Sequence, residues 1–266
     1  VTIDYDPLPF TQGLVTAVDE AGKSFDFEVQ EGYPLLTDWY FNDLPKPFGK
    51  WGMLYEKDQR RLKKGAPDFC FIDEFETLEG RAFRMHVAAG QEWKLRHFAV
   101  GDRYVQLARS GNPPVNFQIS RGCGVEDCTV YTGGGLASAV IGSRDTTLQR
   151  FRVMFKPDTD RLLTTCADGV HCQANIKGPL VEECLFEGMA DDTINIYVPP
   201  NMVREIVSPT EVLVTPGALV LPGETLQVYD PVTGLVRGNV KAVDVALADL
   251  EGQRLLRVTL EHPVEG

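Results

Sequence analysis

The sequence predicts an all-β protein: a right-handed parallel β-helix into which small antiparallel β-barrel modules are inserted. Two observations predict this class. Short apolar runs with alternating polarity, typical of half-buried antiparallel strands, recur in residues 1–112 and 203–266. Between these two regions, residues 113–202 repeat one strand pattern several times, which is typical of a solenoid. We therefore expect a barrel module, a run of β-helix coils and a second barrel-like module, in that order.

The first module shows its alternation most clearly in four runs, residues 13–18, 24–29, 82–87 and 103–107. Residues 43–67 contain three prolines and five lysines and are expected to form a long loop. The tryptophans of this module are expected in its core rather than stacked on a sugar, because tryptophan is usually largely buried. They are Trp39, Trp51 and Trp93.

Two interleaved series of short strands predict the coils. Residues 125–130, 148–153 and 181–186 share one pattern, which is apolar, two polar, Cys or Phe, variable, apolar, at offsets of 23 and 33 residues. A second series falls at residues 139–141, 169–171 and 193–196, with offsets of 30 and then 24. Strands that recur in this way stack on one another at about 4.8 Å, with apolar ladders inside. A leucine-rich repeat would need a regular LxxLxL spacing, which the region lacks.

Alternating strands return after residue 203, and turn sequences at 230–234 and 250–252 separate them. A second small barrel is the natural interpretation. Barrels on both sides of a solenoid suggest modules inserted between coils. The first residues lack a starting Met and resemble the middle of a strand, so we expect the chain to be a fragment or a processed product.

Composition excludes several partners. The net charge is −12, from 38 acidic and 26 basic residues, so a nucleic-acid partner is not expected, and polyanionic substrates such as pectate are disfavoured. No run approaches the 18 apolar residues of a membrane span. The six cysteines show no zinc-ligand spacing and are expected to be buried and apolar in role. Neither a metal nor another cofactor is expected.

The densest reactive cluster lies in the coils. If Val170 is aligned with Ile194, Asp168 and Asp192 have the same phase in successive coils and become stacked neighbours. Carboxyl groups so close can divide the work of hydrolysis, because one is kept neutral by its neighbours and protonates the leaving oxygen while another activates water. Asp191 joins them only if the backbone bends, because consecutive strand residues face opposite ways. A solvated turn or a calcium site is the alternative.

Three further polar residues flank these acids. His171 follows Asp168 on the same strand and is a candidate hydrogen-bond donor to substrate. Glu187 and Asn195 lie on either side of the acid pair and are candidates to bind sugar hydroxyls. Inverting glycosidases hold acid and base about 6.5–9.5 Å apart and retaining ones about 5–5.5 Å, and adjacent coils permit either separation.

The cluster also carries a resemblance to a known family. Residues 165–171, 178–188 and 190–196, supported by 3–13, 101–103 and 107–109, resemble glycoside hydrolase family 110, the bacterial β-helix exo-α-1,3-galactosidases. The specific elements are Asp-Gly-Val-His and Asp-Asp-x-Ile-Asn. The resemblance implies inverting, metal-independent hydrolysis of a terminal α-galactoside, with acid and base drawn from Asp168, Asp191 and Asp192. A more distant likeness to polygalacturonases involves the same acids, but their Gly-His and Arg-Ile-Lys elements are missing, which disfavours pectin.

We therefore expect a secreted or periplasmic glycoside hydrolase that acts on a glycan or oligosaccharide. A non-catalytic carbohydrate-binding or adhesion solenoid is the main alternative, and it would not need the three acids to converge. A polysaccharide lyase is the third, but residues 165–197 offer only Lys177 as a basic partner for the acids. A homo-oligomer is compatible with the sequence, which does not determine the oligomeric state.

Overall fold

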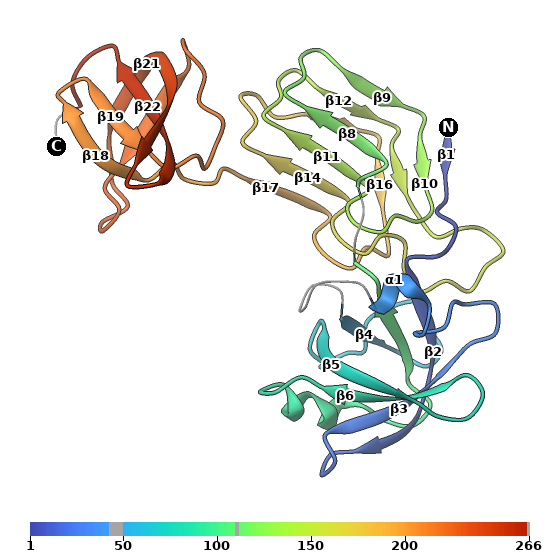
Figure 1. The fold of residues 1–266 in the computed structure, drawn as a ribbon. Helices are drawn as coiled ribbons and strands as arrows, with labels where there is room; N and C mark the ends of the chain where they lie inside the picture. Colours follow the sequence, from blue (N-terminus) through green and yellow to red (C-terminus); the bar gives the residue numbers. More distant parts are fainter. Residues whose placement is uncertain (43–49, 110–111, 265–266) are drawn as a thin grey trace. The chain divides into compact units, whose positions relative to one another are not determined.

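The structure is a computed structural model that describes residues 1–42, 50–109 and 112–264 (Figure 1). The expected all-β class is confirmed, with parallel sheets and a closed antiparallel barrel. The chain forms two compact units, the first made of residues 1–172 and 176–196 and the second of residues 173–175 and 197–266. No helix among the described residues is long and apolar enough to cross a membrane.

The barrel belongs to the first unit. Its six strands close in the order β2-β3-β6-β5-β4-β7, and every printed pairing is antiparallel. Its core contains the fully buried rings of Phe10, Phe27 and Tyr104. Two short helices, α1 (Trp39–Asn42) and the 3-10 helix η1 (Glu92–His97), lie between strands. The strands are β2 (Phe10–Asp19), β3 (Ser24–Val29), β4 (Trp51–Tyr55), β5 (Cys70–Thr77), β6 (Ala82–Val87) and β7 (Arg103–Leu107).

Strand β4 falls inside the segment predicted as a loop, so that prediction is wrong for these residues. All five residues of β4 are buried, and the strand therefore lacks the alternation that marks a half-buried strand. Residues 43–49 of the same predicted loop lie outside the described residues.

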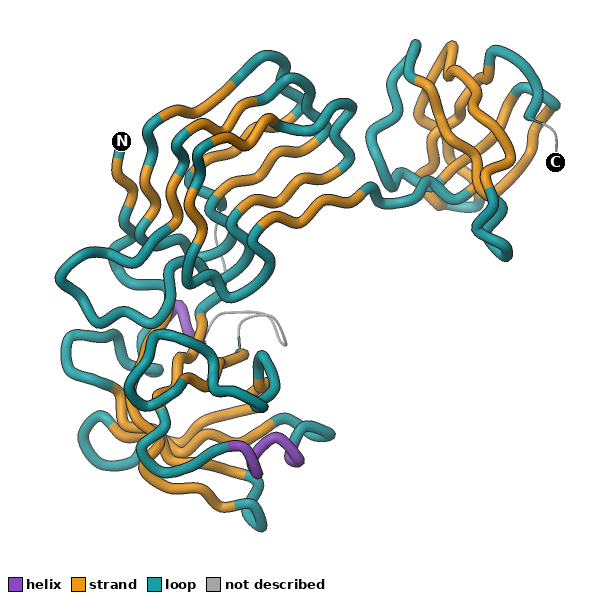
Figure 2. The backbone as a smooth tube through the Cα atoms, turned by 180° about the vertical axis from the view of Figure 1, so that it is seen from behind, coloured by secondary structure: helices purple, strands orange, loops and turns teal. Residues whose placement is uncertain are grey.

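The rest of the first unit contains three parallel sheets, which we call A, B and C (Figure 2). From β8 onward, successive strands pass through sheets B, C and A in turn, and one such passage is a coil. Sheet A contains β1 (Thr2–Ile3), β10 (Thr129–Val130), β13 (Arg152–Val153) and β16 (Leu185–Phe186). Sheet B contains β8 (Val115–Gln118), β11 (Ser138–Ile141), β14 (Val170–Gln173) and β17 (Ile194–Tyr197). Sheet C contains β9 (Gly124–Glu126), β12 (Thr147–Gln149) and β15 (Leu180–Glu182).

The registers test the predicted repeats. In sheet C, Leu148 lies beside Val125 on one side and Val181 on the other, which confirms the offsets of 23 and 33. In sheet B, the amide of Val170 donates to Thr193 O at 3.0 Å, the bond expected when Val170 is paired with Ile194, and this confirms the offset of 24.

The predicted offset of 30 is wrong by two residues. The amide of Ser138 donates to Gly169 O at 2.9 Å, so Ser138 lies beside Val170. A shift of two keeps the same side chains facing inward, which is why the apolar pattern alone did not reveal it.

One corner of each coil is turned by a residue with a positive φ. Asp127, Arg150 and Glu183 have φ of 52°, 49° and 54° at the bend between sheets C and A. Their charges alternate, and Arg150 contacts Asp127 at 2.7 Å and Glu183 at 3.6 Å. The left-handed conformation is unfavourable for most side chains, and it recurs here because the stacked corners hold one another in place.

The coil made of β11, β12 and β13 is extended by residues 154–164, which run from sheet A toward sheet B. This segment, the long-coil loop, contacts the barrel at Asp160. Tyr33 donates to the Asp160 carboxylate at 2.8 Å, and Gln12 donates to its backbone oxygen at 3.2 Å. Gln12 also accepts the amide of Leu162 at 2.9 Å. Leu162 is fully buried and belongs to the barrel's apolar cluster, so this loop joins coils and barrel into one unit.

The second unit contains one antiparallel sheet with the order β18-β19-β22-β21-β20. Its apolar cluster includes Val240, Ala242 and Val258. Strands β18 and β20 are the two edges of this sheet, and no pairing joins them among residues 203–260. The sheet is therefore open, whereas the sequence suggested a second barrel. The strands are β18 (Val203–Ser208), β19 (Glu211–Val214), β20 (Thr225–Tyr229), β21 (Val236–Leu250) and β22 (Gln253–Leu260).

Candidate active site

Asp168 is the most buried of the three predicted acids. It comes just before β14 and is 3% exposed. Its Oδ2 shares a hydrogen bond of 2.6 Å with His171 Nδ1. Burial raises the pKa of Asp168, and the charges of Asp191 and Asp192 raise it further, although the hydrogen bond to His171 acts in the opposite direction. Asp168 is therefore the member of the cluster best suited to hold a proton.

Asp191 and Asp192 come just before β17, one coil further along sheet B, and both are exposed. The amide of Asp192 donates to Asp191 Oδ1 at 3.1 Å, and Asp192 O accepts the amide of Gly169 at 2.9 Å. The backbone therefore bends at this pair, because a side chain and an amide of consecutive residues meet. That bend is the condition under which both carboxylates can lie on the same side.

The three acids come together. One carboxylate oxygen of each of Asp168, Asp191 and Asp192 lies within 4.8 Å of the others. At this separation the acids can share protons and can also hold a divalent cation. The stacking expected from the offset of 24 thus places two of them together, and the bend adds the third.

Arg109, which the sequence analysis did not single out, completes the cluster. Its Nη2 lies 3.0 Å from Asp191 Oδ2, and its guanidinium carbon lies 4.6 Å from the centre of the Trp51 ring. Arg109 follows β7, and Trp51 begins β4, so two barrel strands position it. A guanidinium held between a ring and a carboxylate keeps a fixed orientation and holds its positive charge against the carboxylate. No local sequence pattern links the two residues, because Arg109 and Asp191 are 82 residues apart.

The other predicted site residues lie at different places. Asn195 is on β17, and the register that pairs Val170 with Ile194 places it beside His171. Glu187 is engaged elsewhere: its Oε1 accepts the amide of Phe155 at 3.1 Å, and its backbone oxygen accepts the hydroxyl of Thr164. His171 thus contacts the acid cluster and Asn195 lies beside His171 on the neighbouring strand, while Glu187 holds the long-coil loop in place. Their roles in binding substrate stay predictions.

The close contacts around position 169 explain why a glycine follows Asp168. A Cβ at this position would lie 2.6 Å from Thr193 O and 2.9 Å from Cδ1 of Phe186. Contacts of this length are too short for a side chain, so only glycine lets the coil of Asp168 approach the coil of Asp192 this closely.

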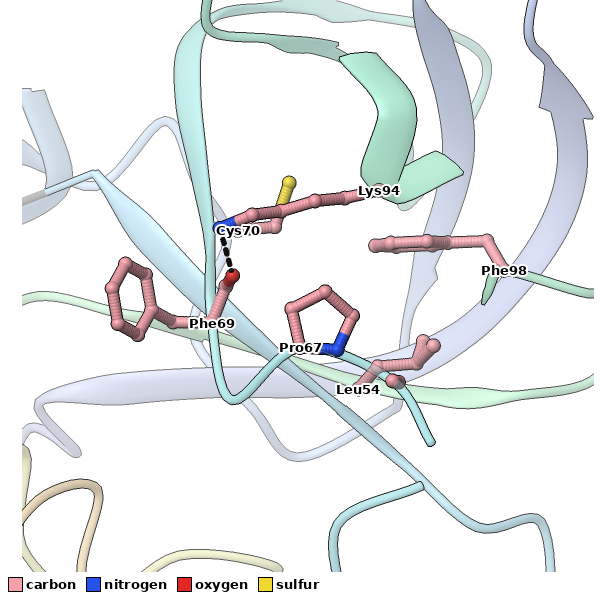
Figure 3. Close-up of a pocket in the computed structure, with 7 residues that line it drawn as sticks. Leu54, Pro67, Phe69, Cys70, Lys94 and Phe98 are labelled. Carbon is pink, nitrogen blue, oxygen red and sulfur yellow. Dashed lines mark hydrogen bonds between the residues drawn. The ribbon is translucent and has the colours of Figure 1, made fainter. Parts of the chain in front are cut away.

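A second buried ionisable group lies in the barrel, well separated in sequence from the acids. Lys94 on η1 donates to Phe69 O at 2.7 Å and lies over the Phe69 ring (Figure 3). Burial lowers the pKa of Lys94 and raises the pKa of the neighbouring Cys70 to about 11. The cavity beside them has a volume of about 10 Å³, which is room for no more than one water molecule. It cannot hold a sugar.

The first unit combines parallel β-coils with a convergent group of carboxylates, and comparison with known proteins shows which proteins the chain resembles. The expected resemblance is confirmed by two curated bacterial proteins named alpha-1,3-galactosidase B. The protein from Akkermansia muciniphila is 28% identical over 158 residues, which are 58% of this chain and 19% of that protein. The protein from Phocaeicola vulgatus is 28% identical over 152 residues, 55% of this chain and 24% of that protein. The matches thus cover about a quarter or less of those relatives' length, and no family model matches the chain.

Proposed function

We propose that this chain carries the catalytic coils of an inverting exo-α-galactosidase that removes terminal α-1,3-linked galactose from glycans. The convergence of Asp168, Asp191 and Asp192 is the observation that carries the proposal. The names of the two relatives support the substrate class. A non-catalytic solenoid would not need these three acids together, so their convergence favours hydrolysis over binding alone.

We further propose that sheets A, B and C form a right-handed parallel β-helix. The regular passage of the chain through sheets B, C and A supports this geometry. The hand follows from the general rule that a connection between parallel strands of one sheet is right-handed in nearly all proteins. In this arrangement each coil presents the residues before its sheet B strand at one edge, where the acids lie.

The proposed division of labour assigns Asp168 as the general acid. Burial and two neighbouring carboxylates favour its protonated form, and a protonated carboxyl can give its proton to the glycosidic oxygen. Asp191 and Asp192 are then the candidates for the base that takes a proton from the attacking water. Arg109 is a positioning residue that holds the Asp191 carboxylate in place.

A lyase mechanism is not favoured by this arrangement, although Arg109 brings a basic group to the acids from outside residues 165–197. A lyase needs a base that can lose a proton, and an arginine guanidinium stays protonated in proteins. Arg109 is also occupied by Asp191 and by the ring of Trp51.

The experiment measures hydrolysis of a chromogenic α-galactoside by the purified protein and by Asp168→Asn, Asp191→Asn and Asp192→Asn. We expect at least one of these variants to lose about 10²-fold or more in kcat, since proton transfer contributes on this scale. Proton NMR of the freshly released sugar is expected to show β-galactose first, because inversion changes the anomeric configuration. Activity is expected to persist in EDTA.

Asp145→Asn is the matched control, because Asp145 is an acid of the same coils that is ion-paired to Lys177 at 2.7 Å and lies outside the cluster. It should retain wild-type activity. Wild-type rates in all three cluster variants would overturn the proposal, as would α-galactose as the first product for the inverting mechanism. Loss of activity in EDTA that calcium restores would replace the metal-free mechanism with a cation site at the same acids.

A further inference from the structure

A groove lies on the first unit at a place that contains none of the three acids. It is lined by residues 6–8, 32–34 and 38–40, with a volume of about 480 Å³. This volume is in the range of ordinary small-ligand sites. The groove is open, so a ligand that stays partly in solvent, such as one residue of a glycan chain, fits it better than a ligand that must be enclosed.

Trp39 distinguishes this groove from the other tryptophan sites. The expectation that all three tryptophans are in the core is wrong, because only Trp51 is buried, whereas Trp39 and Trp93 are 71% and 50% exposed. The ring of Trp51 is covered by Arg109, and the ring of Trp93 has Arg96 at 5.2 Å and Lys94 at 5.8 Å from its centre.

The Trp39 ring has no such cover from the residues that the structure describes. Its aromatic neighbour is Tyr40, which meets it edge to face with 5.6 Å between ring centres. No cation lies over the Trp39 ring among the described residues. Exposing most of a large apolar ring to water is unfavourable unless a ligand covers it, so Trp39 offers a flat stacking surface.

Polar groups surround this surface. Asp6 and Asp38 line the groove, and the Asp6 carboxylate makes no hydrogen bond within the described part of the chain. The hydroxyl of Tyr40, also a lining residue, is buried and has no hydrogen-bond partner there. Burial, then the charges of Asp38 and Asp6, raise the pKa of Tyr40 to about 12, so this hydroxyl is a neutral donor at ordinary pH.

We propose that this groove is a second carbohydrate-binding site, which takes a neutral pyranose residue stacked on Trp39. The C–H face of the sugar packs on the ring, and its hydroxyls donate to Asp6 and Asp38. Two carboxylates without a basic partner in the lining repel an acidic sugar, so sialic acid and uronic acids are excluded. The site tethers a glycan independently of the acid cluster.

The test titrates the protein with N-acetyllactosamine as the probe and measures binding by saturation-transfer NMR. This disaccharide is neutral and lacks a terminal α-galactose, so it is not a substrate of the proposed reaction. We expect binding by the wild-type protein, a loss of about tenfold or more in affinity for Trp39→Ala, and partial recovery for Trp39→Phe, because the flat ring supplies the stacking energy. The 3′-sialylated form of the probe should bind more weakly.

Trp93→Ala is the matched control, because it removes a second exposed tryptophan whose ring is already covered. It should bind like the wild type, and circular dichroism should show the same fold for all variants. Undiminished binding by Trp39→Ala, equal loss in Trp93→Ala, equal affinity for the sialylated probe or no binding to the wild type would each overturn the proposal. Trp39-dependent binding without any galactosidase activity would reject the proposed function and leave this site standing.

Discussion

Arg109 Nη2 lies 3.0 Å from Asp191 Oδ2, so a residue at the end of a barrel strand fixes a carboxylate of the coils. Replacement of Arg109 by Ala removes both the charge and the stacking on Trp51. We expect kcat for a chromogenic α-galactoside to fall about 10²-fold, because misplacing a reacting group costs on this scale. Arg109→Lys should restore only part of the loss, since lysine keeps the charge without the planar fork.

The control for this prediction is Arg96→Ala, which removes another arginine that lies over a tryptophan ring, that of Trp93. Its kcat and KM should match those of the wild type. If Arg109→Ala changed only thermal stability and left kcat intact, its role would be structural.

Asp168 has a raised pKa in the folded protein, and the pH dependence follows from that sign. As a general acid it must be protonated, so kcat/KM should fall as the pH rises through this pKa, and Asp168→Asn should remove that alkaline limb with the activity. The folded protein disfavours the charged form of Asp168. This lowers the free energy of unfolding above the pKa that Asp168 has in the unfolded chain and has no effect below it.

The same sign predicts a stability change. Asp168→Asn should raise the free energy of unfolding relative to the wild type more at pH 7 than at pH 3, as measured by urea denaturation. Asp145→Asn should do the opposite, because Lys177 lowers the pKa of Asp145, whose contribution is present at pH 7 and is lost in acid. The same pH trend in both variants would contradict the assignment.

His171 lowers the pKa of Asp168 through the hydrogen bond of 2.6 Å, against the effects of burial and the neighbouring acids. Replacement of His171 by Phe removes this bond and should move the alkaline limb of the kcat/KM profile to higher pH. The rate at the optimum should also fall, because the Asp168 side chain loses its orienting partner. An unchanged alkaline limb would mean that another group sets it.

Gly169→Ala places a methyl group 2.6 Å from Thr193 O, which forces the coils of Asp168 and Asp192 apart. We expect a loss of about 1–3 kcal/mol in the free energy of unfolding, together with lower kcat, as overpacking disturbs the two acids. Gly178→Ala is the control, since a Cβ there meets nothing within 4 Å. Equal effects at the two glycines would contradict a role for close approach.

The pair Asp168 and Asp192 could be predicted from the sequence because parallel strands copy a repeat directly into contact. An offset of 24 between two apolar patterns becomes a register, and any residue at the same phase is a spatial neighbour. Asp191 required knowledge of the bend before β17, which strand periodicity does not encode. Its place beside the others follows from the hydrogen bond between its side chain and the amide of Asp192.

Arg109 and Trp39 could not be predicted, for different physical reasons. The partner of Arg109 lies in another part of the unit, and its position depends on how the barrel contacts the coils. The exposure of Trp39 on α1, against the burial of Trp51 on β4, depends on how each element packs on the barrel. Strand β4 was missed because full burial removes the alternation on which recognition of a strand depends.

The contacts of the long-coil loop decide how this protein can be divided. Leu162 and Leu163 of this loop, with Cys166 just after it, lie in the apolar cluster of the barrel, and Cys166 Sγ contacts Pro9 O at 3.2 Å. A barrel excised at its own first and last strands would leave this surface open to water and would remove Trp51, the ring that positions Arg109. Transplanting the barrel between related proteins therefore requires that residues 154–166 travel with it, so the exchangeable segment is discontinuous in the gene.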